Sequence, residues 1–243
     1  MKLQSQNLEN LKIAYTKFLA HVYTSDVVLC GGVVMRHYIE NAGLEYPNES
    51  HHDIDILLSN PASLYPSVKE DFVIRHYHLN NEMHRDEFYF NLYCPETKIV
   101  LDIFDAKPFP PIIQETVMFD MPVKIRSIED QFATRVIELA RVLQDTKIRK
   151  SWYDVVLVFS QLIDFTQANF YYTDIINSSW FKKYAPELQE HPNIEKMWKS
   201  ICKKIENMPE LLQEDSGATK KEPKATYECK ECVVHKEFPI TAA

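Results

Sequence analysis

The stretch Asp26-Val-Val-Leu-Cys-Gly-Gly-Val-Val-Met35 decides the predicted fold. Its first half is continuous, apolar and β-branched, which is typical of a short buried strand. Gly31 and Gly32 follow as a strand-to-helix turn, and residues 33–41 supply the helix. Gly43 suits the position after that helix, because glycine adopts a left-handed backbone without strain. The sequence therefore predicts a strand, a glycine turn and a helix in succession.

Further strands are expected on the C-terminal side of this unit. Residues 52–58 alternate polar and apolar side chains, the pattern of a strand with two different faces. The other strand candidates are 72–79, 87–94 and 98–104, with a hairpin at 95–97, and a ribbon at 116–119 and 123–126 that turns at 120–122. An apolar stripe before the unit predicts an opening amphipathic helix, with Leu8, Leu11, Tyr15, Phe18 and Val22. The first 126 residues thus predict a mixed sheet with flanking helices.

The periodicity becomes helical from Ser127 onward. Ser127-Ile-Glu-Asp130 fits a capping-box-like start, in which the serine hydroxyl satisfies a free backbone amide. Three apolar stripes predict three helices, carrying Phe132, Val136, Leu139 and Leu143; Trp152, Val155, Val156, Phe159 and Ile163; and Ile194, Met197, Trp198, Ile201 and Ile205. Beyond Pro209 the chain is polar and lysine-rich, and such a composition buries too little apolar area to order itself. We expect an α+β or α/β domain at 1–126, a helical subdomain at 127–208 and a polar, flexible tail at 209–243.

The chain has 243 residues, a formal net charge of −8 and five cysteines. Because five is an odd and sparse set, we expect reduced thiols rather than a disulfide framework. The acidic balance argues against wrapping of bulk DNA or RNA, although a local basic patch could hold a triphosphate or one RNA. No apolar run approaches the roughly 18 residues of a membrane span, and the first residues carry no secretion signal. The expected location is the cytoplasm.

Asp53 and Asp55 are spaced so that both carboxylates project from one face of the strand at 52–58. Carboxylates that share a site repel each other unless they share a cation, and oxygen ligands suit Mg²⁺ that also contacts phosphates. Asp102 interrupts the apolar strand at 98–104 with the parity of Val100. Asp105 has the opposite parity, so Asp102 is preferred as a third acid. The alternative interpretation is that these acids cap turns or face water.

Three motifs in this order resemble the nucleotidyltransferase superfamily: Leu29-Cys-Gly-Gly32, His51-His-Asp-Ile-Asp-Ile56 and Val100-Leu-Asp-Ile103. The resemblance spans residues 10–160 and is closest to minimal bacterial members, which include abortive-infection toxins and antibiotic nucleotidyltransferases such as the lincosamide type. Ser127-Ile-Glu-Asp130 matches the helix start that such proteins carry after the sheet, and the basic run before Asp154 matches in part. The resemblance implies a nucleotidyltransferase-like catalytic domain at 1–126.

This resemblance also implies an activity, which is transfer of a nucleoside monophosphate from an NTP such as ATP to a hydroxyl, with release of pyrophosphate. The acceptor would be a small molecule, tRNA or protein, and a toxin-like member would have an antitoxin partner. Asp53 and Asp55 would hold two Mg²⁺ ions, and Asp102 would bind one of them and assist deprotonation of the acceptor. Gly31 and Gly32 would hold the triphosphate, with Arg135 and Lys150 as further nucleotide-binding residues.

Two features depart from that pattern. Twenty residues separate Gly32 from Asp53, so an inserted loop must be accommodated at 43–49. Pro47-Asn-Glu-Ser50 stands where the family often has a basic residue before the paired acids. The presence of all three acids favours an enzyme. The missing basic residue favours the alternative, a non-catalytic nucleotidyltransferase-like scaffold that binds a nucleotide or a protein partner.

The remaining candidates are less specific. Cys229-Lys-Glu-Cys232 has the first half of a zinc-ligand spacing, so a Zn²⁺ site would need further ligands, with Cys202 either one of them or a buried thiol. His51 and His52 lie on alternating faces, so at most one of them could act at a site. A basic set could line an acceptor or RNA groove, although ordinary helix-surface charge is the simpler interpretation: Arg126, Arg141, Lys147, Arg149 and Lys150.

Overall fold

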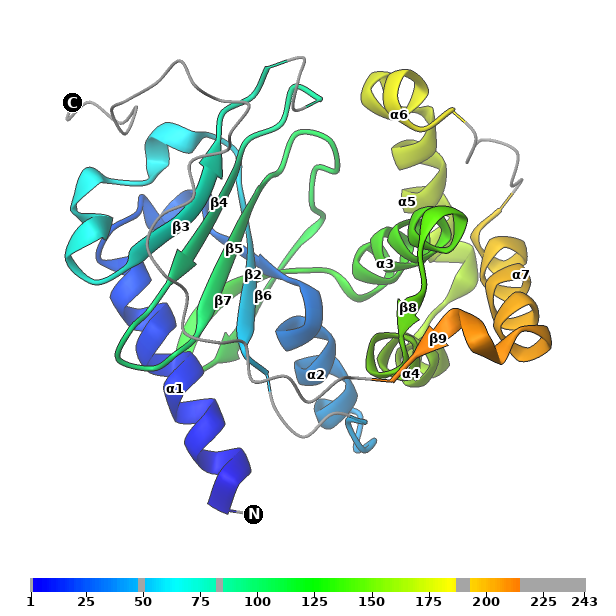
Figure 1. The fold of residues 1–243 in the computed structure, drawn as a ribbon, viewed down its shortest axis with the longest axis horizontal. Helices are drawn as coiled ribbons and strands as arrows, with labels where there is room; N and C mark the ends of the chain where they lie inside the picture. The colour runs from blue at the N-terminus through cyan, green and yellow to red at the C-terminus, as the bar shows by residue number, and fades with distance from the viewer. Residues whose placement is uncertain (1, 48–50, 82–84, 187–192, 215–243) are drawn as a thin grey trace. The chain divides into compact units, whose positions relative to one another are not determined.

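The structure is a computed structural model that describes residues 2–47, 51–81, 85–186 and 193–214. Its described residues fall into two compact units (Figure 1). The first unit contains residues 2–33 and 51–125, and the second contains residues 34–47 and 126–214.

The first unit contains a helix and a sheet of seven strands. The helix is α1 (Lys2–Leu19), and a second helix, α2 (Gly31–Asn41), begins in this unit and continues into the other. The strands are β1 (Val28–Cys30), β2 (Asp53–Leu58), β3 (Val73–His78), β4 (Tyr89–Tyr93), β5 (Val100–Asp105), β6 (Ile113–Met118) and β7 (Met121–Arg126). They lie side by side in the order β3-β4-β5-β2-β1-β7-β6 (Figure 1).

The sheet is mixed, as the sequence predicted. β2 runs parallel to β5 and β1 runs parallel to β7, whereas β1–β2, β3–β4 and β4–β5 are antiparallel pairs. The hairpin at 95–97 is confirmed, since β4 and β5 pair directly on either side of it. The fold is therefore α+β, with a central mixed sheet and flanking helices.

One face of the central strands is apolar and buried beneath α1. Ile54 and Ile56 of β2 and Leu101 and Ile103 of β5 are fully buried on this face, and so is Phe18 of α1. The Phe18 ring meets Phe72 edge-on, with centroids 6.5 Å apart. The alternation at 52–58 explains this arrangement, because every second side chain of a strand reaches the same face. The intervening residues of β2 and β5 are therefore presented on the opposite face of the sheet.

The second unit is helical. Its helices are α3 (Ile128–Asp145), α4 (Lys150–Phe159), α5 (Phe165–Asn177), α6 (Ser179–Tyr184) and α7 (Ile194–Asn207), with a small sheet of β8 (Ile148–Arg149) and β9 (Leu212–Gln213). Phe132 of α3 is fully buried and touches rings from three other elements, Phe159, Phe165 and Trp198, at centroid distances of 6.5, 5.6 and 5.8 Å. An aromatic cluster around Phe132 of α3 therefore lies within the core of this unit, together with buried aliphatic side chains.

Several sequence predictions about these elements need correction. α2 begins at Gly31 rather than Val33, so both glycines belong to its first turn. The ribbon turns at Phe119 and Asp120, which both have positive φ as in a two-residue hairpin, and not at 120–122. Ser127 accepts a bond through its carbonyl from Gln131, but its hydroxyl makes no cap hydrogen bond. Leu8 of the first predicted stripe is about half exposed.

The helical unit also contains α5 and α6, which the sequence interpretation left out. α5 carries its own stripe of buried side chains, Ala168, Tyr172, Ile175 and Ile176, and Asp164 caps it by accepting bonds from two backbone amides. The signal was thus present in the sequence at helical spacing. The tail predicted from 209 begins with a 3-10 turn at Pro209–Leu211, and β9 follows it and pairs with β8. Residues 215–243, with Cys229 and Cys232, lie outside the described residues.

Candidate active site

The three candidate acids share the face of the sheet opposite α1, which we call the acid face. Asp55 of β2 is paired directly with Asp102 of β5, and Asp53 lies one row away, opposite Val100. Adjacent strands are about 4.8 Å apart, so Asp55 and Asp102 are close neighbours. All three side chains are partly exposed. The register of two parallel strands therefore brings together carboxylates that are 47 residues apart in the chain (55 to 102).

The glycine turn lies beside this pair of acids. Cys30, the last residue of β1, is paired with Asp55, so Gly31 follows at the edge of the acid site. Gly31 has φ +73°, a backbone conformation that other residues adopt only with strain. The first turn of a helix presents unpaired amides and the positive end of the helix dipole, which favour a phosphate. The local geometry thus suits the approach of an anion to the acids.

Asp102 is held by two donors from β4. The Tyr89 hydroxyl donates to Asp102 Oδ1 at 2.5 Å, and the Asn91 amide donates to the same oxygen at 2.5 Å. Burial, followed by the hydrogen bond to Asp102, raises the pKa of Tyr89 well above its usual range, so the phenol stays a donor at neutral pH. Because both bonds end on Oδ1, Oδ2 is the oxygen that could meet a metal ion or a proton from the substrate.

Aromatic rings surround the Tyr89 side chain. Its ring lies 5.3 Å from Phe104, 5.7 Å from His76 and 5.8 Å from His78, measured between centroids. Phe104 follows Asp102 by two residues on the same face and is 39% exposed. This ring surface of Tyr89, Phe104, His76 and His78 restricts the rotation of Tyr89, because packed aromatic neighbours leave few rotamers free. It also gives the acid face an exposed aromatic border.

Asp105, the rival third acid, lies on the covered face. It is 4% exposed, and one of its oxygens accepts the Lys107 amide at 2.9 Å. Burial raises the pKa of the Asp105 carboxyl from its ordinary value. The strand parity read from the sequence therefore placed Asp102 and Asp105 on the correct faces. The catalytic role of Asp102 itself stays a prediction.

The donor chemistry of the acid face fits a hard divalent ion, since three carboxylates are the oxygen ligands that Mg²⁺ prefers. Within the described ranges, however, no group of three or more His, Cys, Asp or Glu side chains lies close enough together to hold a metal ion. Asp53, Asp55 and Asp102 would have to turn toward one another around an ion. Carboxylates at adjoining positions of neighbouring strands can do this by rotating their side chains.

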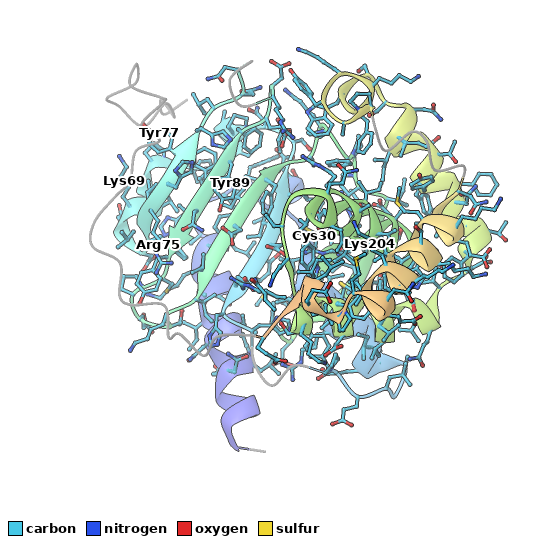
Figure 2. The ribbon with its side chains drawn as sticks, turned by 45° about the vertical axis from the view of Figure 1, so that its right-hand side comes forward. Cys30, Lys69, Arg75, Tyr77, Tyr89 and Lys204 are labelled. Atoms are coloured by element: carbon cyan, nitrogen blue, oxygen red, sulfur yellow. The ribbon has the colours of Figure 1, made fainter. Side chains whose placement is uncertain are left out.

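A basic residue that the sequence interpretation missed also lies on this face. Arg75 sits at an irregularity of β3, where the pairing with β4 shifts between Ile74 and His76. Its guanidinium lies over the Tyr93 ring, 4.0 Å from the centroid. Figure 2 labels Arg75 and Tyr89 on the strands of the sheet. Tyr89, Asn91 and Arg75 carry no motif, and only the register of β3, β4 and β5 reveals them.

The other predicted site residues lie outside this group of strands. Arg135 on α3 pairs with Glu138 at 2.6 Å, and Lys150 on α4 pairs with Asp154 at 2.5 Å. Each ion pair lies within one helix and occupies a side chain that the resemblance implied for nucleotide binding. His51 is buried, and its backbone exchanges two hydrogen bonds with the Asn7 side chain, which gives it a structural role.

Comparisons with known proteins give a weak likeness. No family model matches the chain, and no curated protein matches it in sequence. Among solved structures, an antigenic nucleotidyltransferase-like protein from Paracoccidioides brasiliensis is similar, with 13% identity, a TM-score of 0.39 and coverage of 76% of this chain and 82% of that chain.

Two proteins from Helicobacter pylori are also similar. One is a candidate nucleotidyltransferase, with 14% identity, a TM-score of 0.27 and coverage of 85% and 95%. The other is JHP933, with 15% identity, a TM-score of 0.29 and coverage of 86% and 93%. Likenesses of this size carry no functional argument by themselves.

In the described part of the chain, no helix is both long and apolar enough to cross a membrane.

Proposed function

We propose that the chain is a metal-dependent nucleotidyltransferase, which transfers a nucleoside monophosphate from an NTP to a hydroxyl acceptor. The observation that supports this most is the register that pairs Asp55 with Asp102 and Cys30 with Asp55. This register places the acids of β2 and β5 beside the glycine turn that follows β1. Acids that bind cations and a turn that admits phosphate are the two parts such a reaction needs.

Each residue has a role in the proposed reaction. The acceptor oxygen forms a bond to the α-phosphorus, the bond from that phosphorus to the bridging oxygen breaks, and pyrophosphate leaves with the electron pair. The hydroxyl proton passes toward Asp102, whose Oδ2 is free of the bonds from Tyr89 and Asn91. Asp53, Asp55 and Asp102 would hold Mg²⁺, which would supply charge neutralisation for the transfer when bound. The amides after Cys30 receive the triphosphate.

The acceptor is proposed only as a class, which is a small molecule, tRNA or protein that carries a hydroxyl. The proposal includes an antitoxin partner, because the motifs resemble those of toxin nucleotidyltransferases. It also includes a small-molecule acceptor, because they resemble those of the lincosamide type. The net charge of −8 favours a small molecule or a protein over an RNA that would need broad phosphate contacts. Arg135 and Lys150 would take part in nucleotide binding if their helix ion pairs open.

The test is incubation of the purified chain with each α-labelled NTP, Mg²⁺ and a cell extract, followed by identification of the labelled product. A label that appears on a discrete acceptor, and is lost in an Asp53→Asn, Asp55→Asn double variant, supports the enzyme. The double variant keeps the size of both side chains, so loss of labelling without loss of folding points to the carboxylate charges.

A second candidate function is a non-catalytic scaffold that binds a nucleotide or a protein partner. The observation that favours it is that the acids do not form a closed group of three in the described residues. The same experiment separates the two functions. A chain that binds an NTP but labels no acceptor with any NTP or extract fraction is a scaffold.

A further inference from the structure

Arg75 occupies an unusual position for a structural arginine. The register shift between Ile74 and His76 is a bulge, and bulges re-aim a side chain, often next to a functional site. The guanidinium rests on the Tyr93 ring, and Tyr93 pairs with Val100, which in turn pairs with Asp53. Residues paired across neighbouring strands share a face. Arg75 therefore lies on the acid face, in the row that leads to Asp53.

The charge of Arg75 lacks an anionic partner among the described residues. Its Nε is buried and donates no hydrogen bond, and no ion pair joins Arg75 to a carboxylate within 4 Å in the described part of the chain. Burial lowers the pKa of this guanidinium, while the nearby Tyr93 and Asp102 raise it. Arginine nonetheless stays charged in proteins. A buried donor without an acceptor is costly, so an anionic ligand that accepts from Arg75 would bind favourably here.

The charges around Arg75 indicate which class of ligand it would bind. The Arg75 guanidinium lies over Tyr93, whose partner Val100 is two residues from Asp102, and the charge of Asp102 raises the pKa of Arg75. Three carboxylates repel a phosphate, so a phosphate beside them needs fixed positive charge in addition to any bound metal ion. A guanidinium offers paired donors that match a phosphate, and the Tyr93 ring beneath it holds its plane in one orientation. The segment Pro47-Asn-Glu-Ser50, before the paired acids, supplies no such charge.

We propose that Arg75 binds a phosphate group of the substrate at the edge of the acid face. The proposal rests on the proposed function, in which a triphosphate lies beside Asp53, Asp55 and Asp102. The phosphate belongs either to the triphosphate of the NTP or to a phosphorylated acceptor, since both present the same oxygens. Arg75 is thus the basic residue of the site, and it comes from β3 instead of from the segment before β2.

The test measures equilibrium binding to two probes by calorimetry, in the presence of Mg²⁺. Inorganic tripolyphosphate stands for the NTP, and phenyl phosphate stands for a phosphorylated acceptor. Arg75→Gln is expected to weaken binding of one probe by about 10-fold or more, because charged paired hydrogen bonds are lost. Arg75→Lys keeps the positive charge but loses the paired donors of the guanidinium, so its affinity for the probe should lie between those of wild type and Arg75→Gln. Lys124→Gln is the control, since it removes one positive charge whose partner is the Ser25 carbonyl.

The outcomes separate the possible sources. Weaker tripolyphosphate binding supports the NTP as the source, and weaker phenyl phosphate binding alone supports the acceptor. Unchanged binding of both probes, or no binding of either by the wild type, overturns the proposal. If the wild type binds tripolyphosphate through Arg75 but labels no acceptor, the transferase function fails and the phosphate site stands.

Thermal unfolding distinguishes this role from a structural one. Replacement of a structural arginine would lower the melting temperature, whereas replacement of a partly exposed arginine without an anionic partner in the described residues should leave it nearly unchanged. A clear fall in melting temperature for both Arg75→Gln and Arg75→Lys, with probe binding unchanged, would assign Arg75 to the fold alone.

Discussion

At the scale of single residues, the two strand-borne acids Asp102 and Asp105 show what alternation can and cannot predict. Parity along 98–104 placed Asp102 on the acid face and Asp105 on the covered face. The same pattern could not predict Tyr89, Asn91 or Arg75, because their meeting with Asp102 depends on the register of β3, β4 and β5. Register is a property of strand pairing, and the residue pattern within one strand does not specify which residues of the neighbouring strands it will face.

Asp102→Asn is expected to lower transfer by a factor on the order of 10² or more, with a much smaller change in NTP affinity. The amide keeps the shape but loses the charge and the basic oxygen that the transition state needs. Steady-state kinetics, or pyrophosphate release where the acceptor is unknown, would measure it. Asp105→Asn should retain near wild-type turnover because Asp105 faces the core. A loss of turnover confined to Asp105→Asn would contradict the assignment.

Tyr89→Phe is expected to weaken the affinity for Mn²⁺, a spectroscopic substitute for Mg²⁺, by about 10-fold or more. Removal of a group that hydrogen-bonds a metal-binding carboxylate typically costs this much. The ring contacts with His76, His78 and Phe104 are kept, so folding should be unaffected. The readout is a Mn²⁺ titration followed by electron paramagnetic resonance.

The matched control for that measurement is Tyr77→Phe on the neighbouring strand. The Tyr77 ring stacks on Phe90, whose side chain is buried on the covered face. Equal Mn²⁺ affinities in wild type, Tyr89→Phe and Tyr77→Phe would show that the hydroxyl of Tyr89 does not position a metal ligand.

The raised pKa of Asp105 predicts how stability depends on pH. The folded state binds this proton more tightly than the unfolded state, so the free energy of unfolding falls as pH rises above the ordinary value of 3.8. Asp105→Asn removes that loss. The variant should therefore have a higher melting temperature than wild type at pH 7, and the difference should shrink toward pH 3. A difference that grows on acidification would have the wrong sign and would reject the explanation.

At the scale of secondary-structure elements, strong local signals were predicted well and junctions poorly. The alternation at 52–58 and the hairpin at 95–97 were found as expected. The start of α2 was predicted two residues late, because a pair of glycines indicates a turn even where, as here, the pair forms the first residues of the helix. α5 was left out although Asp164 and a helical stripe of buried residues mark it.

Gly31→Ala tests the junction between β1 and α2. Gly31 has φ +73°, so an alanine at this position would have to adopt a left-handed backbone conformation, which costs about 1–2 kcal/mol. Chemical denaturation should show that loss in the free energy of unfolding, and binding of tripolyphosphate should weaken because the backbone path changes. Gly32→Ala is the control, since Gly32 is not among the residues with positive φ in the described structure. Equal losses in both variants would mean that crowding, not the backbone angle, governs this turn.

At the scale of the whole molecule, each of the two units has its own core. The first unit buries aliphatic strand residues such as Ile54 and Ile103 beneath α1, and the second gathers aromatic rings around Phe132. The periodicity of the sequence predicted that strands give way to helices near residue 126, since strand patterns end and helical stripes begin there. It could not predict that α3 and α7 would both supply rings to one cluster, because that depends on tertiary packing.

Truncation tests where the second unit ends. β9 pairs in parallel with β8, whose Ile148 is fully buried, so a chain that stops at Met208 loses these backbone hydrogen bonds and uncovers an apolar side chain. We expect that truncation to lower the free energy of unfolding by about 1–3 kcal/mol, measured by chemical denaturation. A chain that stops at Glu214 should keep wild-type stability, because the composition of 215–243 is polar and lysine-rich. If the Glu214 truncation is the less stable of the two, or if full-length protein carries stoichiometric zinc that this truncation loses, Cys229 and Cys232 contribute to the fold and the polar-tail interpretation is wrong.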